Sequence, residues 1–287
     1  MIGLIEVMLL AGAPLLLAVL GELVLQRSGA LNIGLEGTML AAAFGAAMGA
    51  SMGGSAIAGI GGAIAGAAIP SVVFGLLVFH RRIDAIVVGV AMNLVAAGGT
   101  TLLYQHPRTG RRLAGGLPSF PKLEIFGIAV DPLILFAWLA APLLIGALLW
   151  KSRPGLRLRA AGENPDSLSY GGFPVARYRW MALGVETVLA GLAGAAVAIG
   201  LAHGFAENMI AGRGFIALSI VIFARWSVSG AVGGVALFAL ATALQYSAQA
   251  GGSGWGYQIF LAFPYVLTLM ILLAVPGIVR APAALGK

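Results

Sequence analysis

Long apolar stretches separated by short polar connections occupy most of the chain. They cover residues 2–25, 38–52, 55–79, 85–103, 132–150, 180–201, 214–224, 229–248 and 257–279. A helix needs about 20 apolar residues to cross a bilayer, and none of the stretches shows the period-two alternation of a membrane barrel strand. The pattern predicts an all-α, polytopic membrane helix bundle with about nine transmembrane helices. The stretches 38–52 and 214–224 are short for a full crossing, so we expect broken or re-entrant segments there.

The overall composition agrees with a membrane protein and excludes other classes. Hydrophobic residues make up 60% of the 287 residues and charged residues only 9%, against about 45–50% and 25% in soluble domains. So few polar residues cannot cover a soluble globule, and disordered chains are far more polar. The absence of cysteine excludes disulfides and zinc–thiolate sites. The first ten residues carry no Lys or Arg, so we expect a retained span there rather than a signal peptide.

The distribution of basic residues predicts an orientation. Nine crossings place the termini on opposite sides, and with the polar gap 151–179 inside, twelve of the 17 Lys and Arg residues lie inside. Because basic residues concentrate on the cytoplasmic side, we expect the orientation N-out/C-in. The net charge of +7 then belongs to the loops, and no nucleic-acid partner is expected. Five basic residues remain outside. Arg213 lies in one outer loop, and the other four could attract an acidic binding protein or contact lipid: Arg108, Arg111, Arg112 and Lys122.

The polar gap 151–179 contains the signals for one very short helix. Asn164 can cap the first free N–H groups, Pro165 suits the first helical position, and Asp166 opposes the positive helix end. The pair Gly171–Gly172 can supply a left-handed terminating residue. Since a helix of one to two turns is not stable alone, it needs a surface to dock on. Once docked, it could carry motion from a soluble partner into the spans. A basic loop held by anionic headgroups is the alternative.

Polar residues within the apolar stretches are candidates for a translocation pathway. Asn32 and Glu36 are four residues apart, so one helical face would carry both, and Gly34 and Gly37 beside them permit a break in the helix. Broken helices commonly line substrate paths in transporters, although the same residues could simply pin a bent helix. Asn93 is a third pathway candidate, since it lies within the apolar stretch 85–103.

A second glycine-flanked short segment lies in the other half of the chain. Gly212 and Gly214 precede the short segment 215–224, much as Gly34 and Gly37 precede the stretch 38–52. We expect these glycines to serve as a gate or a helix break, and the two short segments hint at an internal repeat.

Two acidic residues have basic neighbours in the sequence at the ends of predicted spans. Glu22 could form a local interfacial pair with Arg27, and Asp84, two residues after Arg82, favours a helix cap or an ion pair. A carboxylate at the centre of a bilayer costs about 2.5–3.5 kcal/mol, so such residues usually face a partner or a cavity.

Three blocks resemble one family of membrane proteins. They are similar, in the same order, to blocks of the sugar- and nucleoside-type ABC importer permeases, a branched-chain amino acid/ribose-type family. The blocks are residues 21–37 (GELVLQRSGALNIGLEG), 159–165 (RAAGENP) and 212–226 (GRGFIALSIVIFARW). The resemblance spans nearly the whole chain and is closest to the nucleoside branch. It implies that one set of residues couples the chain to an ATPase by docking into its cleft: Gly162, Glu163, Asn164, Pro165 and Asp166.

The resemblance also implies the partners and the location. They are an ABC ATPase subunit, a second permease subunit, identical or different, an extracytoplasmic substrate-binding protein or lipoprotein, and the bilayer of a bacterial cytoplasmic (inner) membrane. The chain contains no P-loop sequence, so ATP must be used by the partner ATPase. We expect a single multi-pass permease domain over residues 1–287, with a coupling loop at 151–179. No catalytic residue, cofactor or metal site is expected in this chain.

Other functions remain open from the sequence alone. The same type of permease could carry a simple sugar such as ribose instead of a nucleoside. An ion-coupled secondary transporter acting alone would need acidic groups within its spans, and Glu36, Asp84 and Glu186 are available. A purely structural membrane subunit has no positive support.

Overall fold

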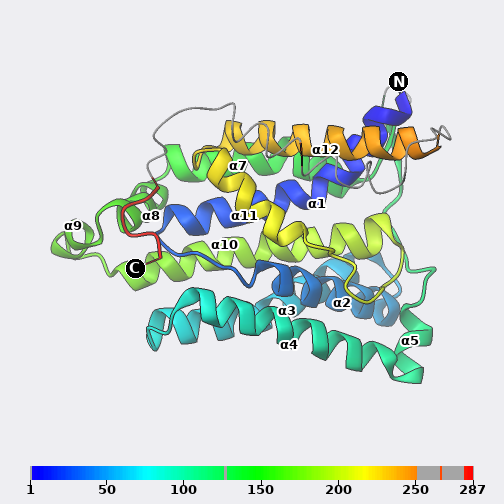
Figure 1. Cartoon of the computed structure of the whole chain (residues 1–287), viewed down its shortest axis with the longest axis horizontal. Helices are drawn as coiled ribbons and strands as arrows, with labels where there is room; N and C mark the ends of the chain where they lie inside the picture. The colour runs from blue at the N-terminus through cyan, green and yellow to red at the C-terminus, as the bar shows by residue number, and fades with distance from the viewer. Residues whose placement is uncertain (1, 126–127, 251–265, 267–280, 287) are drawn as a thin grey trace.

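Helices follow the apolar stretches of the sequence closely in the computed structural model, which describes residues 2–125, 128–250, 266 and 281–286 (Figure 1). The helices are α1 (Ile2–Arg27), α2 (Leu35–Gly53), α3 (Ala56–Gly75), α4 (Ala85–Gln105), α5 (Pro107–Leu113), α6 (Pro132–Leu135), α7 (Ala141–Lys151), α8 (Arg153–Glu163), α9 (Pro165–Tyr170), α10 (Val175–Ala195), α11 (Arg213–Phe223) and α12 (Val228–Ala250). Three π-helical turns continue α3, join α6 to α7 and extend α10: η1 (Leu76–His80), η2 (Phe136–Ala140) and η3 (Ala196–Leu201).

Six helices of the described residues are long and apolar enough to cross a membrane. They begin at residues 3, 56, 85, 132, 175 and 228. The stretches 38–52 and 214–224 correspond to α2 and α11. The expectation of a short segment is confirmed for α11, which has 11 residues, but is wrong for α2, which extends at both ends to 19 residues. The ninth predicted span, 257–279, lies outside the described residues. The chain is therefore a predominantly helical, multi-pass membrane protein.

Two local elements depart from the predicted all-helical pattern. The loop after α5 contains a small antiparallel hairpin, β1 (Leu123–Ile125) and β2 (Ile128–Val130), with Glu124 opposite Ala129. The polar gap holds two helices rather than one, because α8 precedes the expected short helix. Ser152 accepts a hydrogen bond from the N–H of Gly155 (3.0 Å) and Pro154 occupies the first turn of α8. This cap and proline are the start signals that the sequence prediction missed.

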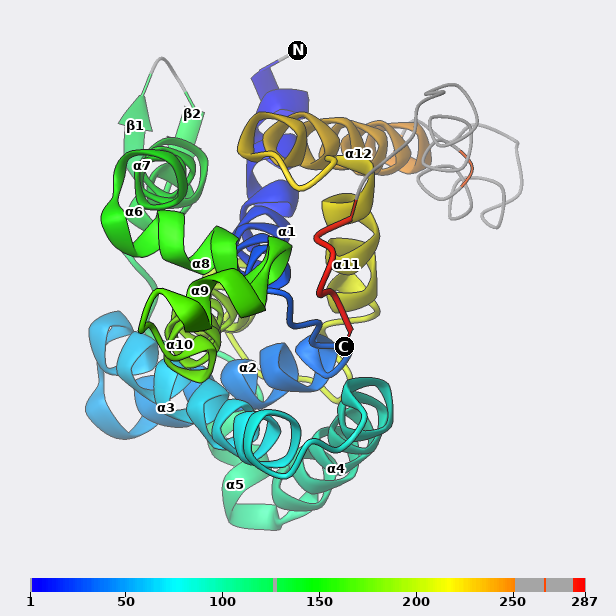
Figure 2. The same cartoon turned by 90° about the vertical axis from the view of Figure 1, so that its left-hand side faces the viewer.

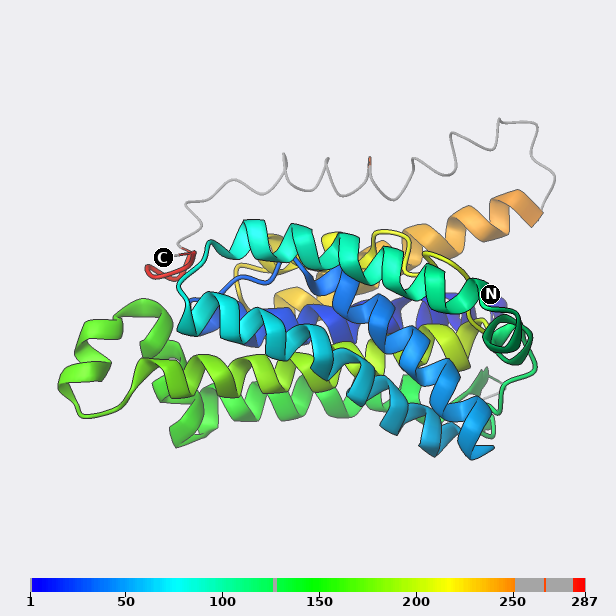
Figure 3. The ribbon, with the colours of Figure 1, turned by 90° about the horizontal axis from the view of Figure 1, so that it is seen from below.

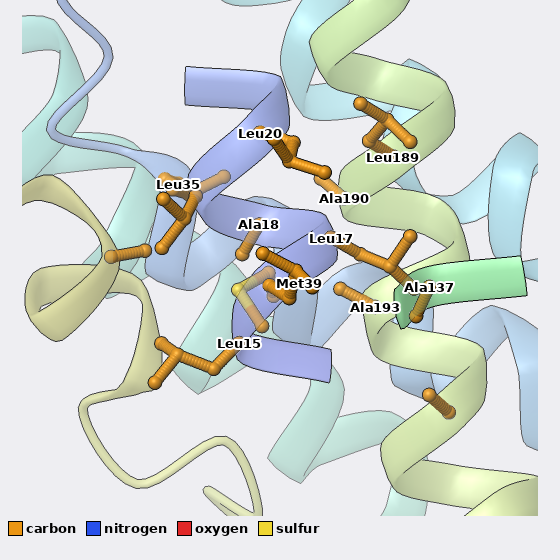
Figure 4. Close-up of a cluster of buried hydrophobic side chains, with 14 of the residues drawn as sticks. Leu15, Leu17, Ala18, Leu20, Leu35, Met39, Ala137, Leu189, Ala190 and Ala193 are labelled. Carbon is orange, nitrogen blue, oxygen red and sulfur yellow. The ribbon is translucent and has the colours of Figure 1, made fainter. Parts of the chain in front are cut away.

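The core lies where α1 packs between α10, α12 and α11. Leu15, Leu16 and Leu17 on successive positions of α1 are all buried, as is Glu186 on α10. A helix that is apolar on every side belongs in the interior of a membrane bundle. Figure 4 shows the side chains of Leu17 and Leu20 beside the alanines of α10. By contrast, α4 exposes most of its large side chains and forms the rim of the bundle (Figure 3).

Glycines bring α2 and α3 into backbone contact. A Cβ on Gly49 would overlap the carbonyl oxygen of Ala58, and a Cβ on Gly66 would overlap that of Ala41. Lipid tails provide no hydrophobic drive for helix association, so such close small-residue contacts hold membrane helices together. The pair α2–α3 therefore forms a tightly packed unit.

The two halves of the bundle repeat one arrangement in opposite directions. In the first half, α1 crosses the bundle, the chain turns back as an irregular segment, and α2 begins inside the bundle (Figure 1). In the second half, α10 crosses the other way, residues 202–212 return, and α11 begins inside the bundle. The N-termini of α2 and α11 meet there. Inverted repeats with discontinuous helices at their interface are a recurring design in transporters.

Candidate functional site

The connection between α1 and α2 is a buried, non-helical segment built around Asn32. The side-chain amide of Asn32 donates to Glu186 Oε1 on α10 (2.8 Å), and its Oδ1 accepts from the N–H of Gly34 (2.9 Å). The expectation that Asn32 and Glu36 share a helical face is wrong, because α2 begins only at Leu35. The two side chains point to different partners instead.

Glu36 joins the N-termini of α2 and α11. It lies in the first turn of α2, and its two carboxylate oxygens accept from the N–H groups of Gly212 (2.7 Å) and Gly214 (2.6 Å) at the start of α11. A Cβ on Gly214 would lie 2.6 Å from the backbone of Glu36. A carboxylate is stabilised at the positive end of a helix. The carboxylate of Glu36 lies close to the N-termini of both α2 and α11.

Asn93 of α4 holds the start of α2 from the other side. Its Oδ1 accepts from the N–H of Gly37 (2.8 Å), and its Nδ2 donates to the carbonyl of Ile33 (2.9 Å). Gly34 and Gly37 allow α2 to approach α4, since a Cβ on Gly37 would lie 2.9 Å from Asn93. The structure thus brings Asn32, Asn93 and the glycines together around the helix break. The two asparagine side chains bind backbone groups there, and Asn32 also binds Glu186.

The remaining expectations for acidic residues had mixed outcomes. Asp84 caps α4 by accepting from the N–H groups of Ile86 (2.8 Å) and Val87 (3.1 Å), which confirms the cap. The local pair of Glu22 with Arg27 is wrong. Glu22 accepts from Gln26 Nε2 (2.8 Å), while Arg27 faces Glu163 at 3.5 Å. The helical turn directs Glu22 into the bundle and Arg27 toward its end.

Glu22 and Glu186 are both completely buried and face the same Asn32. The backbone N–H of Asn32 donates to Glu22 (3.3 Å), and its side chain donates to Glu186 (2.8 Å). A buried polar group without partners costs several kcal/mol, so this asparagine stabilises both carboxyl groups. Residues 154 positions apart in sequence are joined in this way.

The predicted short helix of the coupling loop is present as α9, six residues long. Asn164 Oδ1 accepts from the N–H of Ser167 (3.0 Å), as expected for the cap, and the left-handed residue is Gly172 (φ 79°). Leu168 is buried against Ala161 and Tyr178. The opposite face of α9 is open, and Tyr170 is 92% exposed. The surface that this helix needs is therefore supplied by α8 and α10.

A cavity of about 660 Å³ lies beside the start of α11, bordered also by α1, η3 and α12. Its wall is apolar except for a few side chains that can form hydrogen bonds, which are Arg213, Thr242, Gln245 and Tyr246. None of Asn32, Glu36 and Asn93 lines it. Arg213, expected in an outer loop, lies in this wall, where its guanidinium donates to the carbonyls of Met209 (3.1 Å) and Ile210 (3.0 Å).

Sequence reasoning missed this cavity because its walls come from four separate segments. The available signal was the spacing of Thr242 and Gln245, three residues apart and so on one face of an apolar helix. In the described part of the chain, no three His, Asp or Glu side chains gather closely enough to hold a metal ion.

The fold has a counterpart among solved structures. It is similar to a structure described as an inward-facing conformation of a metal-chelate type ABC transporter, with a TM-score of 0.56 and 16% sequence identity. The similarity covers 95% of this chain and 85% of the other. The bundle therefore has the fold of an ABC transporter permease.

The family follows from the sequence comparisons. The model of the branched-chain amino acid transport system permease component matches residues 4–276, and the chain belongs to this family. It is 34% identical to the nucleoside ABC transporter permease protein NupC of Lactococcus lactis, and the match covers 97% of this chain and 94% of that protein. It is 31% identical to the guanosine ABC transporter permease protein NupQ of Bacillus subtilis, with 97% and 93% covered. The chain is an ABC transporter permease of the inner membrane and a transport component rather than an enzyme.

Proposed function

We propose that the chain is the membrane-spanning subunit of an ATP-driven importer that carries nucleosides into the cytoplasm. Two nucleoside permeases, similar over nearly their whole length, support this substrate class. The observation that carries the coupling is α9, a capped six-residue helix fixed by Leu168 and open on its other face. A helix held in this way moves with the elements on which it is docked.

The coupling residues would contact a separate ATPase. Glu163, Asn164 and Asp166 are exposed at one end of the bundle, where α8 and α9 project beyond the other helices (Figure 1). We infer that residues 163–166 enter a cleft of an ABC ATPase, which binds and hydrolyses the ATP, and that this chain binds no cofactor of its own. Gly162, which was expected to dock with them, is buried against the backbone of Arg27 and can only position them. A second permease, identical or different, and an extracytoplasmic binding protein or lipoprotein complete the proposed assembly.

Charge supports an orientation with this end in the cytoplasm. The loop 151–179 and the segment 281–286 lie at one end of the bundle, and α1 begins at the other end (Figure 1). Basic residues of the coupling loop and of the η1–α4 turn lie at the same end as that segment. Because basic residues favour the cytoplasmic side, we infer N-out/C-in with nine crossings, of which 257–279 would be the last.

The cavity beside α11 is our candidate for part of the solute path. Its volume of about 660 Å³ falls within the roughly 300–1,000 Å³ of ordinary ligand pockets, which is ample for a nucleoside. An apolar wall suits the base, and Gln245, Thr242 and Tyr246 can exchange hydrogen bonds with a ribose.

Uptake into cells or native membrane vesicles tests the proposal. We expect radiolabelled guanosine to accumulate in the wild type, and uptake to stop when ATP is depleted while the proton gradient is maintained. Deletion of residues 162–166 should abolish uptake and leave the chain in the membrane. Uptake that persists after the deletion would show that the loop does not couple transport to an ATPase.

A sugar is the second candidate substrate. TsgC13 of Haloferax volcanii, whose name assigns it to glucose transport, is 32% identical, with 86% of this chain and 78% of that protein covered. Competition decides between the two classes. Excess uridine should block guanosine uptake, and excess glucose or ribose should not.

An ion-coupled transporter acting alone remains the candidate of another class. Such a protein would take up solute with ATP depleted and stop when the proton gradient is collapsed. The structure gives its candidate acids other contacts, because Glu36 binds α11, Glu186 binds Asn32 and Asp84 caps α4.

A further inference from the structure

Four segments that are distant in sequence meet at the cytoplasmic end of α1. They are Arg27 at the end of α1, Glu163 at the end of α8, the turn between α11 and α12, and residues 281–286. Figure 2 shows these segments side by side around the start of the α1–α2 connection.

Arg27 contacts two of the other segments directly. Its Nε donates to the carbonyl of Trp226 in the α11–α12 turn (2.8 Å), and its Nη1 lies 3.5 Å from Glu163 Oε1. The guanidinium also lies 5.8 Å from the ring centre of Trp150. Because the guanidinium is planar and presents several donors in a fixed geometry, a displacement of Glu163 acts on the same rigid group that holds Trp226.

Close backbone packing leaves little room for independent movement at this point. A Cβ on Gly162 would overlap the carbonyl oxygen of Arg27, and a Cβ on Gly29 would lie 3.2 Å from Gly162 Cα. The N–H of Ala284 donates to the carbonyl of Gly162 (2.9 Å), and Gly286 donates to Gly29 (3.4 Å). The end of α8, the end of α1 and residues 281–286 therefore move together.

The α11–α12 turn is a strained element that depends on these contacts. Arg225 and Trp226 both adopt left-handed backbone conformations (φ 53°), which cost about 1–3 kcal/mol each in a residue other than glycine. The indole of Trp226 is buried and donates to Gln26 Oε1 (2.7 Å). One face of the turn is thus fixed by two successive residues of α1, Gln26 and Arg27.

We propose that Arg27 is the positioning residue that carries displacement of the coupling loop to the α11–α12 turn, an inference that rests on the proposed coupling role of residues 162–166. Beyond the turn, α11 is a single helix of 11 residues. Its far end is held by Glu36 and borders the 660 Å³ cavity. Movement of Glu163 therefore reaches the cavity through Arg27, Trp226 and the body of α11.

The test compares transport with ATP hydrolysis in the intact transporter, purified from native membranes and reconstituted in liposomes. We expect Arg27→Gln to lower guanosine uptake per ATP hydrolysed at least tenfold, while the assembled complex still hydrolyses ATP. Arg81→Gln is the matched control, since it removes the same charge from an exposed position in the turn between η1 and α4. A residue with a purely structural role would lower the yield of complex and leave uptake per ATP unchanged.

A second variant covers the case in which Arg27→Gln does not fold. Glu163→Gln changes a side chain that is 53% exposed, so folding should tolerate it, and we expect a smaller fall in uptake per ATP. Combining Arg27→Glu with Glu163→Arg should recover part of the loss of the single reversals. Wild-type uptake per ATP in both Arg27→Gln and Glu163→Gln would overturn the proposal. Loss of the coupling role itself would appear differently, as ATP-driven uptake that survives deletion of 162–166.

Discussion

The two irregular connections that precede α2 and α11 occupy equivalent places in the inverted repeat, but they differ in how they are held. The first, residues 28–34, is mostly buried, and Asn32 and Asn93 satisfy its backbone. The second, residues 202–212, is half exposed. It contains left-handed residues at four positions, which are His203, Asn208, Ala211 and Gly212.

Under the proposed coupling, this difference distinguishes a firmly held segment that can transmit displacement from a segment that can rearrange. Segments with exposed backbone and few buried contacts open at low free-energy cost, and the second connection is of this kind where it borders the cavity. Its buried anchor is Phe205, whose ring packs edge-on against Phe44 (5.2 Å) and Tyr104 (5.3 Å). The first connection begins directly after Arg27, whose side chain contacts Glu163 and the α11–α12 turn. We therefore expect solute to affect the second connection and the ATPase to act through the first.

The largest effect should come from breaking the point where both connections meet. Gly214→Ala places a methyl group about 2.6 Å from the backbone of Glu36, and overpacking against backbone that cannot move aside costs up to about 3 kcal/mol. We expect a marked fall in the yield and melting temperature of the purified protein. Gly233→Ala is the control, because no atom lies within 4 Å of a Cβ there. Equal stability of the two variants would contradict the close contact of α2 and α11.

Removing the charge of Glu36 should have the next largest effect. In Glu36→Gln one oxygen is replaced by an amide that cannot accept from Gly212 or Gly214, which loses a hydrogen bond worth about 2 kcal/mol. We expect a lower melting temperature in detergent. The exposed Glu124→Gln, on β1, should melt like the wild type. If Glu36→Gln were equally stable, the carboxylate would not be needed at the two helix ends.

Loosening the first connection alone should cost less. Asn93→Ala leaves the N–H of Gly37 and the carbonyl of Ile33 without their partner, at a cost of about 1–2 kcal/mol. Thermal unfolding measures this, with Leu94→Ala, at an exposed position of the same helix, as the control. Since this connection follows directly on Arg27, uptake per ATP hydrolysed should fall as well. An unchanged melting temperature would show that other groups hold the break.

The smallest effect on stability, but a selective effect on transport, should come from the cavity. Gln245→Leu removes a hydrogen-bonding group from the wall, and one hydrogen bond of about 1 kcal/mol corresponds to about fivefold in affinity. We expect a KM for guanosine raised about fivefold with an unchanged melting temperature. Ser247→Ala, next to the wall but not part of it, serves as the control. An unchanged KM would remove the cavity from the solute path.

Local signals in the sequence predicted local structure well. The apolar stretches predicted the positions of the apolar helices, though not those of α5 and α8, and Asn164 with Pro165 predicted the start of α9. The hairpin β1–β2 was not foreseen, because its two strands of three residues are too short for a periodic pattern.

Long-range contacts could not be predicted in the same way. The glycines and polar residues of the break were recognised as unusual, but not their partners. Glu36 binds Gly212 and Gly214, which lie 176 and 178 positions away, and Asn32 binds Glu186 on another helix. Only the packing of the helices determines such pairs. The same holds for Arg27, whose nearest acidic residue in sequence is not the one it contacts.

Single-cysteine labelling tests the central contrast between the two connections most directly, because the chain has no cysteine of its own. Thr242→Cys lies in the cavity wall next to the second connection, and Ile33→Cys lies in the first connection. With an impermeant thiol reagent added outside, we predict that Thr242→Cys is labelled and that guanosine slows its labelling. Ile33→Cys should remain unlabelled with or without guanosine. Protection of Ile33→Cys by guanosine, or labelling of Thr242→Cys that ignores guanosine, would contradict the account.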